Sequence, residues 1–347
     1  MSDETAFICA YTEDDSGGIY TFGLQGGGEL EELHRQPVEA TSFLAISADG
    51  AHLYSVNRIE GGQVQAFDIE SGGSLSPLNA VSSGGDGPAY VSVDDAGEYA
   101  FIANYAGGTV AMAPIANDGS LAEPSHVVEH EGSSVNESRQ QEPHPHSIVV
   151  GPNDDYVYVP DLGTDTIEIY RIDRANDRLE PADPSNVELH PGAGPRHFDF
   201  HENGELGFVI NELDSTITAY NYDAETGALD PLETYDTLPE GYDEESYCAD
   251  IHIHPNGELL YGSNRGHNSI VGFDLDSETG ELDLIDHEST RGDWPRNFAI
   301  SPDGAHLFVE NRRTDSIVTF AIEDDGTLAV IDDDLSLPEP ICMEFRP

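Results

Sequence analysis

One unit of about 50 residues recurs along the chain, and this recurrence constrains the fold more than any other feature of the sequence. The unit is clearest in residues 192–212, where a tight Asn203-Gly204 turn joins two runs in which apolar and polar residues alternate. Such alternation predicts β-strands, and a short Asn-Gly connection predicts a hairpin between them. The turn position recurs at Gly50, Gly97, Asp154, Gly204, Gly257 and Gly304.

Other positions of the unit also keep their residue types. A third apolar run follows each hairpin, and Gly-Xaa-Leu turns such as Gly227-Ala-Leu229 lead into a fourth, so each unit is predicted to form four antiparallel strands. A proline usually stands nine positions before the turn, and the position seven after it holds Asn57, Asn104, Asp161, Asn211, Asn264 and Asn311. Because both residue types recur in most units, we interpret them first as residues that build the repeated unit rather than as site residues.

The two ends of the chain complete one further unit. Ile19 and Phe22 repeat the third-strand pattern without a first strand before them, and residues 340–343 repeat the first-strand pattern with nothing after it. Pairing the two ends would close a ring and remove an exposed sheet edge. We therefore predict an all-β fold with almost no helix: one seven-bladed β-propeller domain over residues 1–347, closed by a C-terminal strand that completes the N-terminal blade. A β-sandwich or an open solenoid does not explain the split unit.

Two spacings between units are stretched, and the extra residues fall within 126–144 and 229–247. Both stretches precede a first strand, so we expect loops on one face of the ring. The loop over 126–144 fits either a lid or a solvated excursion.

The charge balance excludes several classes of partner. The formal net charge is −55, from 68 acidic and 13 basic residues, and every basic residue is an arginine. Strand patterning persists through the acidic regions, so we interpret the excess as a surface adapted to high salt, where the Debye length falls to about 3 Å at 1 M, rather than as disorder. Without a basic face, nucleic acid and anionic membranes are not expected partners.

Targeting and metal signals are weak. No basic region followed by a long apolar run opens the chain, so we expect a cytoplasmic protein without a membrane span. Cys9, Cys248 and Cys342 do not form a disulfide framework, and we expect buried free thiols. His144 and His146 resemble metal ligands, but no further ligands follow at a recognisable spacing, so neither a metal nor a cofactor is predicted.

In a four-strand meander, the start of the first strand and the end of the second strand lie on the same face. The residues at these positions change type from unit to unit, which favours a ligand site over construction. Five of the 13 arginines occupy them: Arg58, Arg196, Arg265, Arg296 and Arg312. Because an arginine fork donates two parallel hydrogen bonds to phosphate or carboxylate, this clustering predicts an anionic ligand. Pairing with the many nearby acids is the alternative.

Candidate acids and bases fall on the same strand ends, namely His146, His197, Glu212, Asp250 and His252. A histidine can take a proton from water near neutral pH, and a carboxylate flanked by arginine can orient it. His252 could equally be a buried core histidine whose hydrogen bonds are made within the protein.

The motifs PHPHS at 143–147, GAGPRH at 192–197, NEL at 211–213, ADIH at 249–252, NR at 264–265 and PR at 295–296 resemble those of the seven-bladed propeller lactonases. That family includes 6-phosphogluconolactonases and carboxy-cis,cis-muconate cyclising enzymes, and the resemblance covers nearly the whole chain. It implies a site made of His146, Glu212, Arg196 and Arg265, to which we assign catalysis. For substrate binding we assign Arg296, Asp250, His197, Asn211 and Asn264.

We therefore expect hydrolysis of a sugar lactone, foremost 6-phosphogluconolactone, in a central channel where arginines hold the anionic substrate and His146 or Glu212 activates water. A muconate-type lactonising reaction needs the same cationic pocket and stays an alternative. A non-catalytic propeller that binds a partner is the other alternative; its rim should carry exposed aromatics, whereas acids and glycines prevail here.

Overall fold

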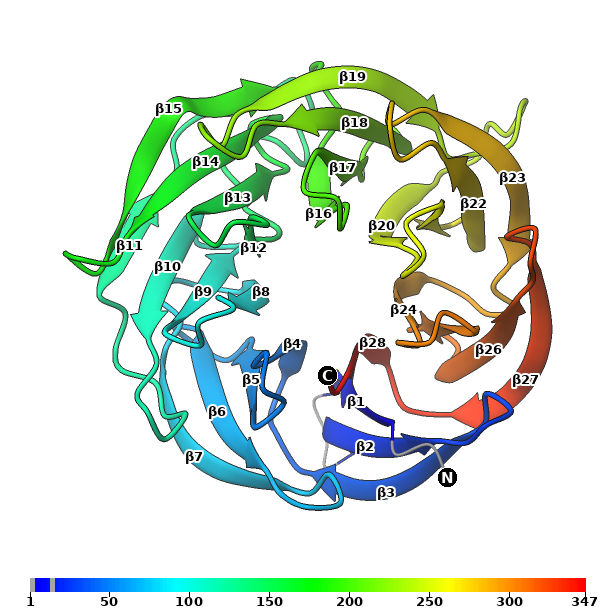
Figure 1. The fold of residues 1–347 in the computed structure, drawn as a ribbon, viewed down its shortest axis with the longest axis horizontal. Helices are drawn as coiled ribbons and strands as arrows, with labels where there is room; N and C mark the ends of the chain where they lie inside the picture. Colours follow the sequence, from blue (N-terminus) through cyan, green and yellow to red (C-terminus); the bar gives the residue numbers. More distant parts are fainter. Residues whose placement is uncertain (1–3, 13–15) are drawn as a thin grey trace.

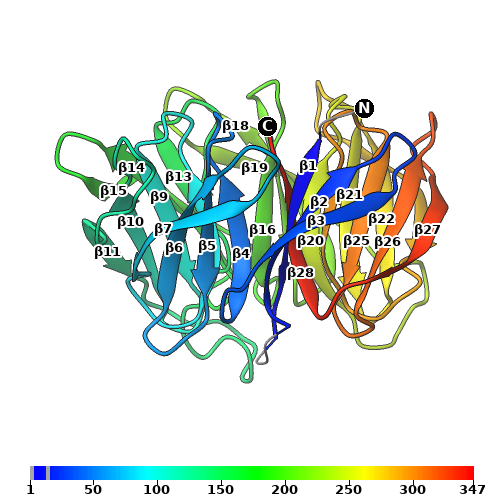
Figure 2. The ribbon, with the colours of Figure 1, turned by 90° about the horizontal axis from the view of Figure 1, so that it is seen from below.

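The computed structural model of the chain describes residues 4–12 and 16–347. Within these residues it contains 28 β-strands in seven four-stranded sheets and no helix. The sheets stand around a common axis as the blades of a propeller, in chain order from blue to red (Figure 1). Seen from the side, the strands run between two faces on which the connecting loops gather (Figure 2). The predicted seven-bladed propeller is therefore confirmed.

The strands of blades 1 to 4, each from the inner to the outer edge, are β4 (Thr41–Ile46), β5 (His52–Asn57), β6 (Gln63–Ile69) and β7 (Leu75–Ser82); β8 (Pro88–Val93), β9 (Tyr99–Asn104), β10 (Thr109–Pro114) and β11 (His126–Glu129); β12 (Val149–Val150), β13 (Tyr156–Asp161), β14 (Thr166–Asp173) and β15 (Arg178–Glu188); β16 (Pro195–Phe200), β17 (Leu206–Asn211), β18 (Thr216–Tyr222) and β19 (Leu229–Asp236).

The strands of blades 5 to 7, in the same direction, are β20 (Tyr247–Ile253), β21 (Leu259–Arg265), β22 (Ser269–Leu275) and β23 (Leu282–Ser289); β24 (Pro295–Ile300), β25 (His306–Asn311), β26 (Ser316–Ile322) and β27 (Leu328–Ser336); β28 (Pro340–Phe345), β1 (Thr5–Ala10), β2 (Gly18–Leu24) and β3 (Leu30–Gln36).

Ring closure follows the split unit. The last strand, β28, pairs antiparallel with β1 and forms the inner edge of blade 7. In this pairing Cys9 lies opposite Cys342, and both are buried free thiols, as the sequence predicted. The seventh blade thus depends on contacts between the two ends of the chain.

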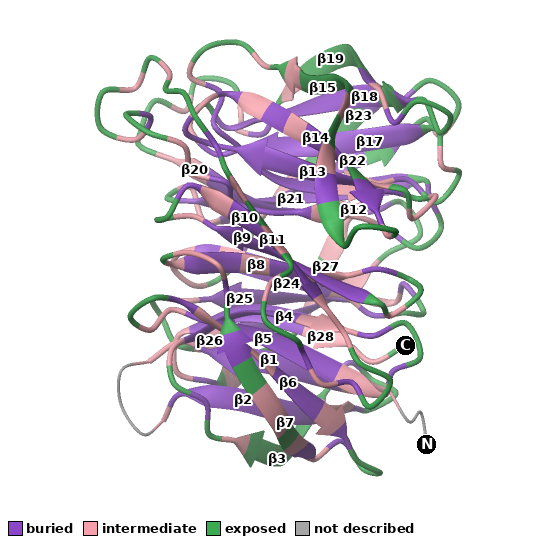
Figure 3. Ribbon diagram, turned by 90° about the vertical axis from the view of Figure 1, so that its left-hand side faces the viewer, coloured by how far each residue is buried: buried purple, intermediate pink, exposed green. Residues whose placement is uncertain are grey.

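The core lies between neighbouring blades. Every residue of β9 and β17 is buried, because both faces of the second strand touch an adjacent blade. The outer strand β19 is exposed at most positions, and Figure 3 shows this change from the buried interior to the green outer edge. Ile210 of blade 4 and Leu260 of blade 5 belong to one such core cluster. Full burial of an apolar side chain of this size stabilises the fold by about 1.5–3 kcal/mol.

The recurrent asparagine has a constructive role in four blades. Its Nδ2 group donates to a backbone carbonyl in the segment that enters the blade, as in Asn57 to Glu39, Asn104 to Ser83, Asn264 to Thr237 and Asn311 to Thr290. Asp161 takes this position in blade 3 and accepts a hydrogen bond from His130 Nδ1 at 2.7 Å instead. The side chain therefore fastens these five blades to their incoming connections, whereas Asn211 of blade 4 donates to Thr216 and Thr218 within its own blade.

Two local predictions need correction. The stretches 126–144 and 229–247 are not loops throughout, because their first parts form the outer strands β11 and β19. The first strand of blade 3 is also shorter than the pattern indicates: β12 has two residues, and Pro145 meets Asp161 only as an isolated bridge. Pro143 and Pro145 lack the N–H donors that a continuous ladder requires.

Candidate active site

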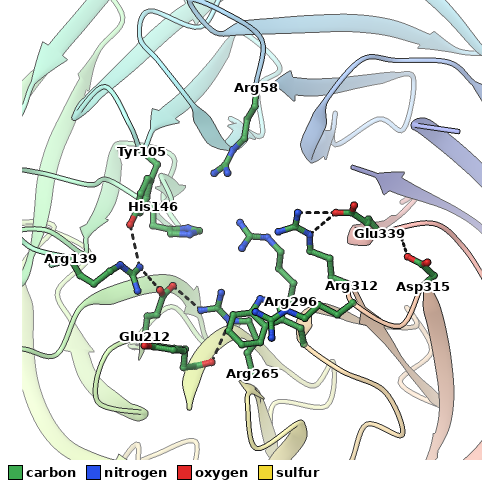
Figure 4. Close-up of a pocket in the computed structure, with 13 residues that line it drawn as sticks. Arg58, Tyr105, Arg139, His146, Glu212, Arg265, Arg296, Arg312, Asp315 and Glu339 are labelled. Atoms are coloured by element: carbon green, nitrogen blue, oxygen red, sulfur yellow. Dashed lines mark hydrogen bonds and ion pairs between the residues drawn. The ribbon is translucent and has the colours of Figure 1, made fainter. Parts of the chain in front are cut away.

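A cavity of about 720 Å³ lies where the second strands of several blades end. It opens on the face that the residue pattern indicated (Figure 4). Its lining residues are Arg58, Tyr105, Arg139, His146, Glu212, Tyr247, Arg265, Trp294, Arg296, Arg312, Arg313, Asp315 and Glu339. Five of them directly follow the recurrent asparagine, because the hairpin brings that strand end to the axis: Arg58, Tyr105, Glu212, Arg265 and Arg312.

Backbone irregularities aim the residues at the start of the inner strands. The register of β16 against β17 shifts between Pro195 and His197, and that of β24 against β25 shifts between Pro295 and Asn297. Arg196 and Arg296 therefore stand at equivalent β-bulges, which turn a side chain away from the regular alternation of a strand. Bulges of this kind often adjoin binding sites.

Glu212 is the anionic centre of the cavity. Its Oε1 atom lies 2.5 Å from Arg139 Nη2, and its Oε2 atom lies 2.8 Å from Arg265 Nη2 and 3.2 Å from Arg196 Nε. Burial alone would raise the pKa of Glu212, but the charges of the three arginines outweigh burial and hold the pKa well below its usual range. Glu212 is therefore a carboxylate that organises cations, and a poor proton acceptor.

His146 stands beside this group and is 4% exposed. Its ring lies 5.3 Å from the ring of Tyr105 and 5.2 Å from that of His197, and its Nδ1 atom has no hydrogen-bond partner among the described residues. Burial and the charge of Arg196 lower the pKa of His146 well below its usual value. The imidazole is therefore neutral near pH 7 and can accept a proton.

Three further arginines line the remaining wall, and two of them, Arg58 and Arg296, have no counterion among the described residues. Arg296 has no hydrogen bond or ion pair within the part of the chain that the structure describes, and Arg58 donates only to the Pro88 carbonyl, at 3.2 Å. Arg312 pairs with Glu339 at 2.8 Å. Burial, together with four neighbouring arginines, lowers the pKa of Arg296 well below its usual value. Figure 4 shows the Arg58 and Arg296 side chains extending into the open space. Glu339 and Asp315 also line the cavity, so Arg58 and Arg296 are the arginines of this wall without a carboxylate partner in the described chain.

Trp294, the single tryptophan, forms part of the same wall. Guanidinium carbons lie over its ring, that of Arg313 at 3.4 Å and that of Arg265 at 5.3 Å from the ring centroid. Its φ angle of 69° is a left-handed conformation that is strained for a bulky residue. The hydrogen bond from its N–H to Asn268 Oδ1, at 3.0 Å, helps to hold that conformation. The indole therefore fixes two arginines in place.

Arg139 and Trp294 are site residues that the sequence reasoning missed. Arg139 comes from the loop between β11 and β12, donates to Tyr105 Oη at 3.3 Å and lies over the Tyr247 ring at 5.9 Å. Gln140 anchors the loop, because its Nε2 donates to Asp165 at 2.7 Å. The stretched spacing before the third unit was the available signal, since it placed extra residues on this face. The loop supplies a wall of the cavity.

The structure brings His146, Glu212, Arg265 and Arg296 together in the cavity wall. Five other predicted site residues are buried behind that wall: Arg196, His197, Asn211, Asp250 and Asn264. Arg196 is 1% exposed and lies under Glu212.

His252 lies apart from the cavity wall and pairs with Asp250 at 3.1 Å. Attraction to Asp250 outweighs burial and raises the pKa of His252 to about 9. Over residues 4–12 and 16–347, no group of three or more histidine, cysteine or acidic side chains is arranged to hold a metal ion. In the same residues there is no helix long and apolar enough to cross a membrane.

Comparisons with known proteins give a consistent result. Residues 5–345 match the family described as "Lactonase, 7-bladed beta-propeller". The chain is 32% identical to a 6-phosphogluconolactonase of Bacillus subtilis over 352 aligned positions, which cover 99% of each chain. It is 35% identical to a 6-phosphogluconolactonase of Formosa agariphila, with 90% of this chain and 91% of the relative covered. The structure of a periplasmic gluconolactonase from Pseudomonas aeruginosa superimposes with a TM-score of 0.94 at 30% identity, covering 99% of both chains.

Proposed function

The chain belongs to the seven-bladed β-propeller lactonase family and is a lactone-hydrolysing enzyme, and we propose that its substrate is an anionic sugar lactone, foremost 6-phosphogluconolactone. The observation that carries this proposal is Arg296, a guanidinium in the cavity wall whose charged neighbours are other arginines. Arg296 is partly buried, and a cation that has lost part of its hydration without an acidic partner is costly unless a ligand supplies the opposite charge. The chain as a whole carries a net charge of −55, so this local positive excess points to a specific anion.

The phosphate would sit at the end of the cavity formed by Arg58, Arg296 and Arg312. A phosphate monoester carries a charge of about −1.5 to −2 near neutral pH and presents three acceptor oxygens. Guanidinium groups match these oxygens with paired, charge-assisted hydrogen bonds. We assign Arg58 and Arg296 to the phosphate, because neither has a carboxylate partner within the described chain.

The lactone ring would then lie near His146 and Glu212. His146 takes a proton from a water molecule as the water oxygen bonds to the lactone carbonyl carbon. The tetrahedral intermediate collapses when the bond from that carbon to the ring oxygen breaks, and the ring oxygen takes the proton to become a hydroxyl group. The product acid releases one proton to solution. His146 is the base in this scheme, because its Nδ1 atom has no hydrogen-bond partner among the described residues, whereas both carboxylate oxygens of Glu212 are held by arginines.

Arg265 and Arg139 stabilise the transition state electrostatically. Both guanidinium groups are held against Glu212, so their remaining N–H donors are fixed before the substrate arrives. Donors aimed at the growing negative charge on the carbonyl oxygen lower the barrier without reorganisation. Aldonolactones also hydrolyse unaided, so a modest set of groups suffices.

The test compares a phosphorylated and a plain gluconolactone on variants of the phosphate end. Arg58→Gln and Arg296→Gln should each lower kcat/KM for 6-phosphogluconolactone by about 10- to 150-fold, the loss expected for one hydrogen bond to a charged group. Hydrolysis of plain gluconolactone should stay within about twofold. Arg171→Gln is the matched control, because Arg171 is half-exposed and pairs with Glu180 outside the cavity.

Two outcomes would oppose the assignment. Equal losses on both lactones would show that Arg58 and Arg296 serve the ring rather than a phosphate. If the unaltered protein hydrolyses plain gluconolactone faster than the phosphorylated lactone, its activity matches the gluconolactonase name of the Pseudomonas relative instead. A separate assay with His146→Ala should show a fall in kcat with a smaller change in KM.

A further inference from the structure

Two hydrogen bonds and one ion pair link four buried side chains in a row that ends at Glu212. Asp250 Oδ1 lies 2.6 Å from His197 Nδ1, and His197 Nε2 lies 3.0 Å from Arg196 Nη1. Arg196 Nε in turn lies 3.2 Å from Glu212 Oε2, at an angle that gives an ion pair rather than a hydrogen bond. His197, Asp250 and Arg196 are 5%, 2% and 1% exposed, so water does not compete for these contacts.

The donors and acceptors along this row of side chains allow one arrangement of protons. Arginine can only donate, so His197 Nε2 must be the acceptor in its contact with Arg196. An ionised aspartate can only accept, so His197 Nδ1 must carry the proton that faces Asp250. The charge of His252 and the hydrogen bonds from His252 and His197 outweigh burial and hold the pKa of Asp250 well below its usual range. His197 is therefore neutral, with its hydrogen on Nδ1.

Neighbouring groups keep the His197 ring in this orientation. The Phe43 and Tyr90 rings stack on each other at 4.0 Å, and both meet the His197 ring edge-on, at 5.8 Å and 5.3 Å. Packing thus restricts rotation of the imidazole, and the carboxylate selects its tautomer. The Arg196 guanidinium is also bound by the Ala249 carbonyl.

We infer that His197 and Asp250 are positioning residues: Asp250 fixes the tautomer of His197, and His197 in turn holds Arg196 under Glu212. This differs from a contact of either residue with the substrate, because neither lines the cavity. The effect on turnover rests on the proposed lactonase site, whereas the tautomer of His197 does not. The prediction for the tautomer and the prediction for turnover can therefore be contradicted independently.

Asp250→Asn is the sharpest variant, because the two oxygens of Asp250 have different partners. Oδ2 receives hydrogen bonds from His252 Nε2 and Asn297 Nδ2 and a longer one, at 3.3 Å, from the Phe298 N–H. Among the described residues, Oδ1 receives a hydrogen bond from His197 alone. An asparagine would keep its oxygen toward the several donors and turn its NH₂ group toward His197 Nδ1. That donor would move the hydrogen of His197 to Nε2, where it opposes an N–H of Arg196.

The first measurement is the ¹⁵N spectrum of histidine-labelled protein, which separates protonated from unprotonated ring nitrogens. The chain has 14 histidines, so the His197 signals are identified by their loss in His197→Gln. In the unaltered protein we expect hydrogen on Nδ1 and a bare Nε2. In Asp250→Asn the pattern should reverse. Hydrogen on Nε2 in the unaltered protein would overturn the inference. This part of the test does not depend on whether Asp250→Asn folds.

The second measurement is kinetic. Asp250→Asn should lower kcat/KM by about 10- to 150-fold, mostly through kcat, because substrate contacts remain. His252→Gln is the matched control: it alters a donor to the other oxygen of Asp250 and leaves the His197 contact in place. Its kcat should stay within about twofold. An equal fall in both variants would show a merely structural role and overturn the inference. A reversed tautomer with unchanged kcat would overturn it too.

If the unaltered protein hydrolyses neither lactone, the proposed function fails, while the tautomer measurement still stands as a test of the buried row of side chains.

Discussion

Glu212 lies 2.8 Å from Arg265 and is only 4% exposed, so this contact is a buried ion pair within a cluster of three arginines. Removing one partner of a buried pair leaves uncompensated charge and typically costs about 3–5 kcal/mol. We expect Glu212→Gln to lower the free energy of unfolding by about 3 kcal/mol or more, measured in urea at constant salt.

Glu180 provides the comparison, because it also bridges two arginines, Arg171 and Arg178, but with half-exposed partners. Glu180→Gln should cost less than about 1 kcal/mol. Equal effects of the two substitutions would mean that water reaches Glu212 freely and that the cluster is not electrostatically tight.

Ring closure depends on β28. Deleting residues 340–347 removes the buried side chains Ile341, Cys342 and Met343 and exposes the edge of β1. Three buried side chains of this size contribute several kcal/mol, a large share of the roughly 5–15 kcal/mol that stabilises a domain. We expect loss of cooperative thermal unfolding. A truncated protein that melts like the full chain would contradict the role of β28.

Glu310 is a buried acid whose two carboxyl oxygens have no hydrogen-bond partner among the described residues. Burial, with the nearby charge of Asp250, raises the pKa of Glu310 well above 4.5. Above pH 4.5 the unfolded chain loses this proton while the folded chain keeps it, so stability present below that pH falls as pH rises, by up to about 1.4 kcal/mol per unit.

Glu310→Gln removes this titration while keeping the shape of the side chain. Its stability relative to the unaltered protein should therefore increase steadily from pH 4.5 toward pH 7. Urea unfolding of both proteins across that range measures the difference, and a constant difference would show that Glu310 ionises normally in the folded state.

The acid excess gives a salt prediction. With 68 acidic and 13 basic residues, carboxylates repel one another more strongly when the Debye length grows from about 3 Å at 1 M to about 10 Å at 0.1 M. The melting temperature should rise between about 0.1 and 2 M salt. A flat curve would refute adaptation to high salt.

The ring and the face of the site could be predicted from sequence because both follow from local pattern. The repeat gave the blades, and the hairpin placed the residue after each recurrent asparagine at the axis, as Arg58, Glu212 and Arg312 show. The interior of the site was harder to predict. Arg196 and Arg296 occupy equivalent bulges, yet one is buried behind the wall and the other lines it, because their different neighbours decide where a long side chain fits.

Arg139 could not be predicted as a site residue, because no repeat constrains its loop. The path of that loop depends on contacts distant in sequence, including the hydrogen bonds from Gln140 to Asp165 and from Ser134 to Asp165. Choosing between His146 and Glu212 as the base likewise needed the three arginines around Glu212, since the same carboxylate with fewer cations nearby would accept a proton more readily.

The central claim is that the cavity selects an anionic lactone. Its most direct test is the ratio of kcat/KM for 6-phosphogluconolactone to that for gluconolactone, measured with the unaltered protein in about 2 M salt and corrected for spontaneous hydrolysis. Loss of one charge-assisted contact changes kcat/KM by about 10-fold or more, so we predict a ratio of at least about 10 in favour of the phosphorylated lactone. A ratio near one or below it, or no hydrolysis above the spontaneous rate, would contradict the claim.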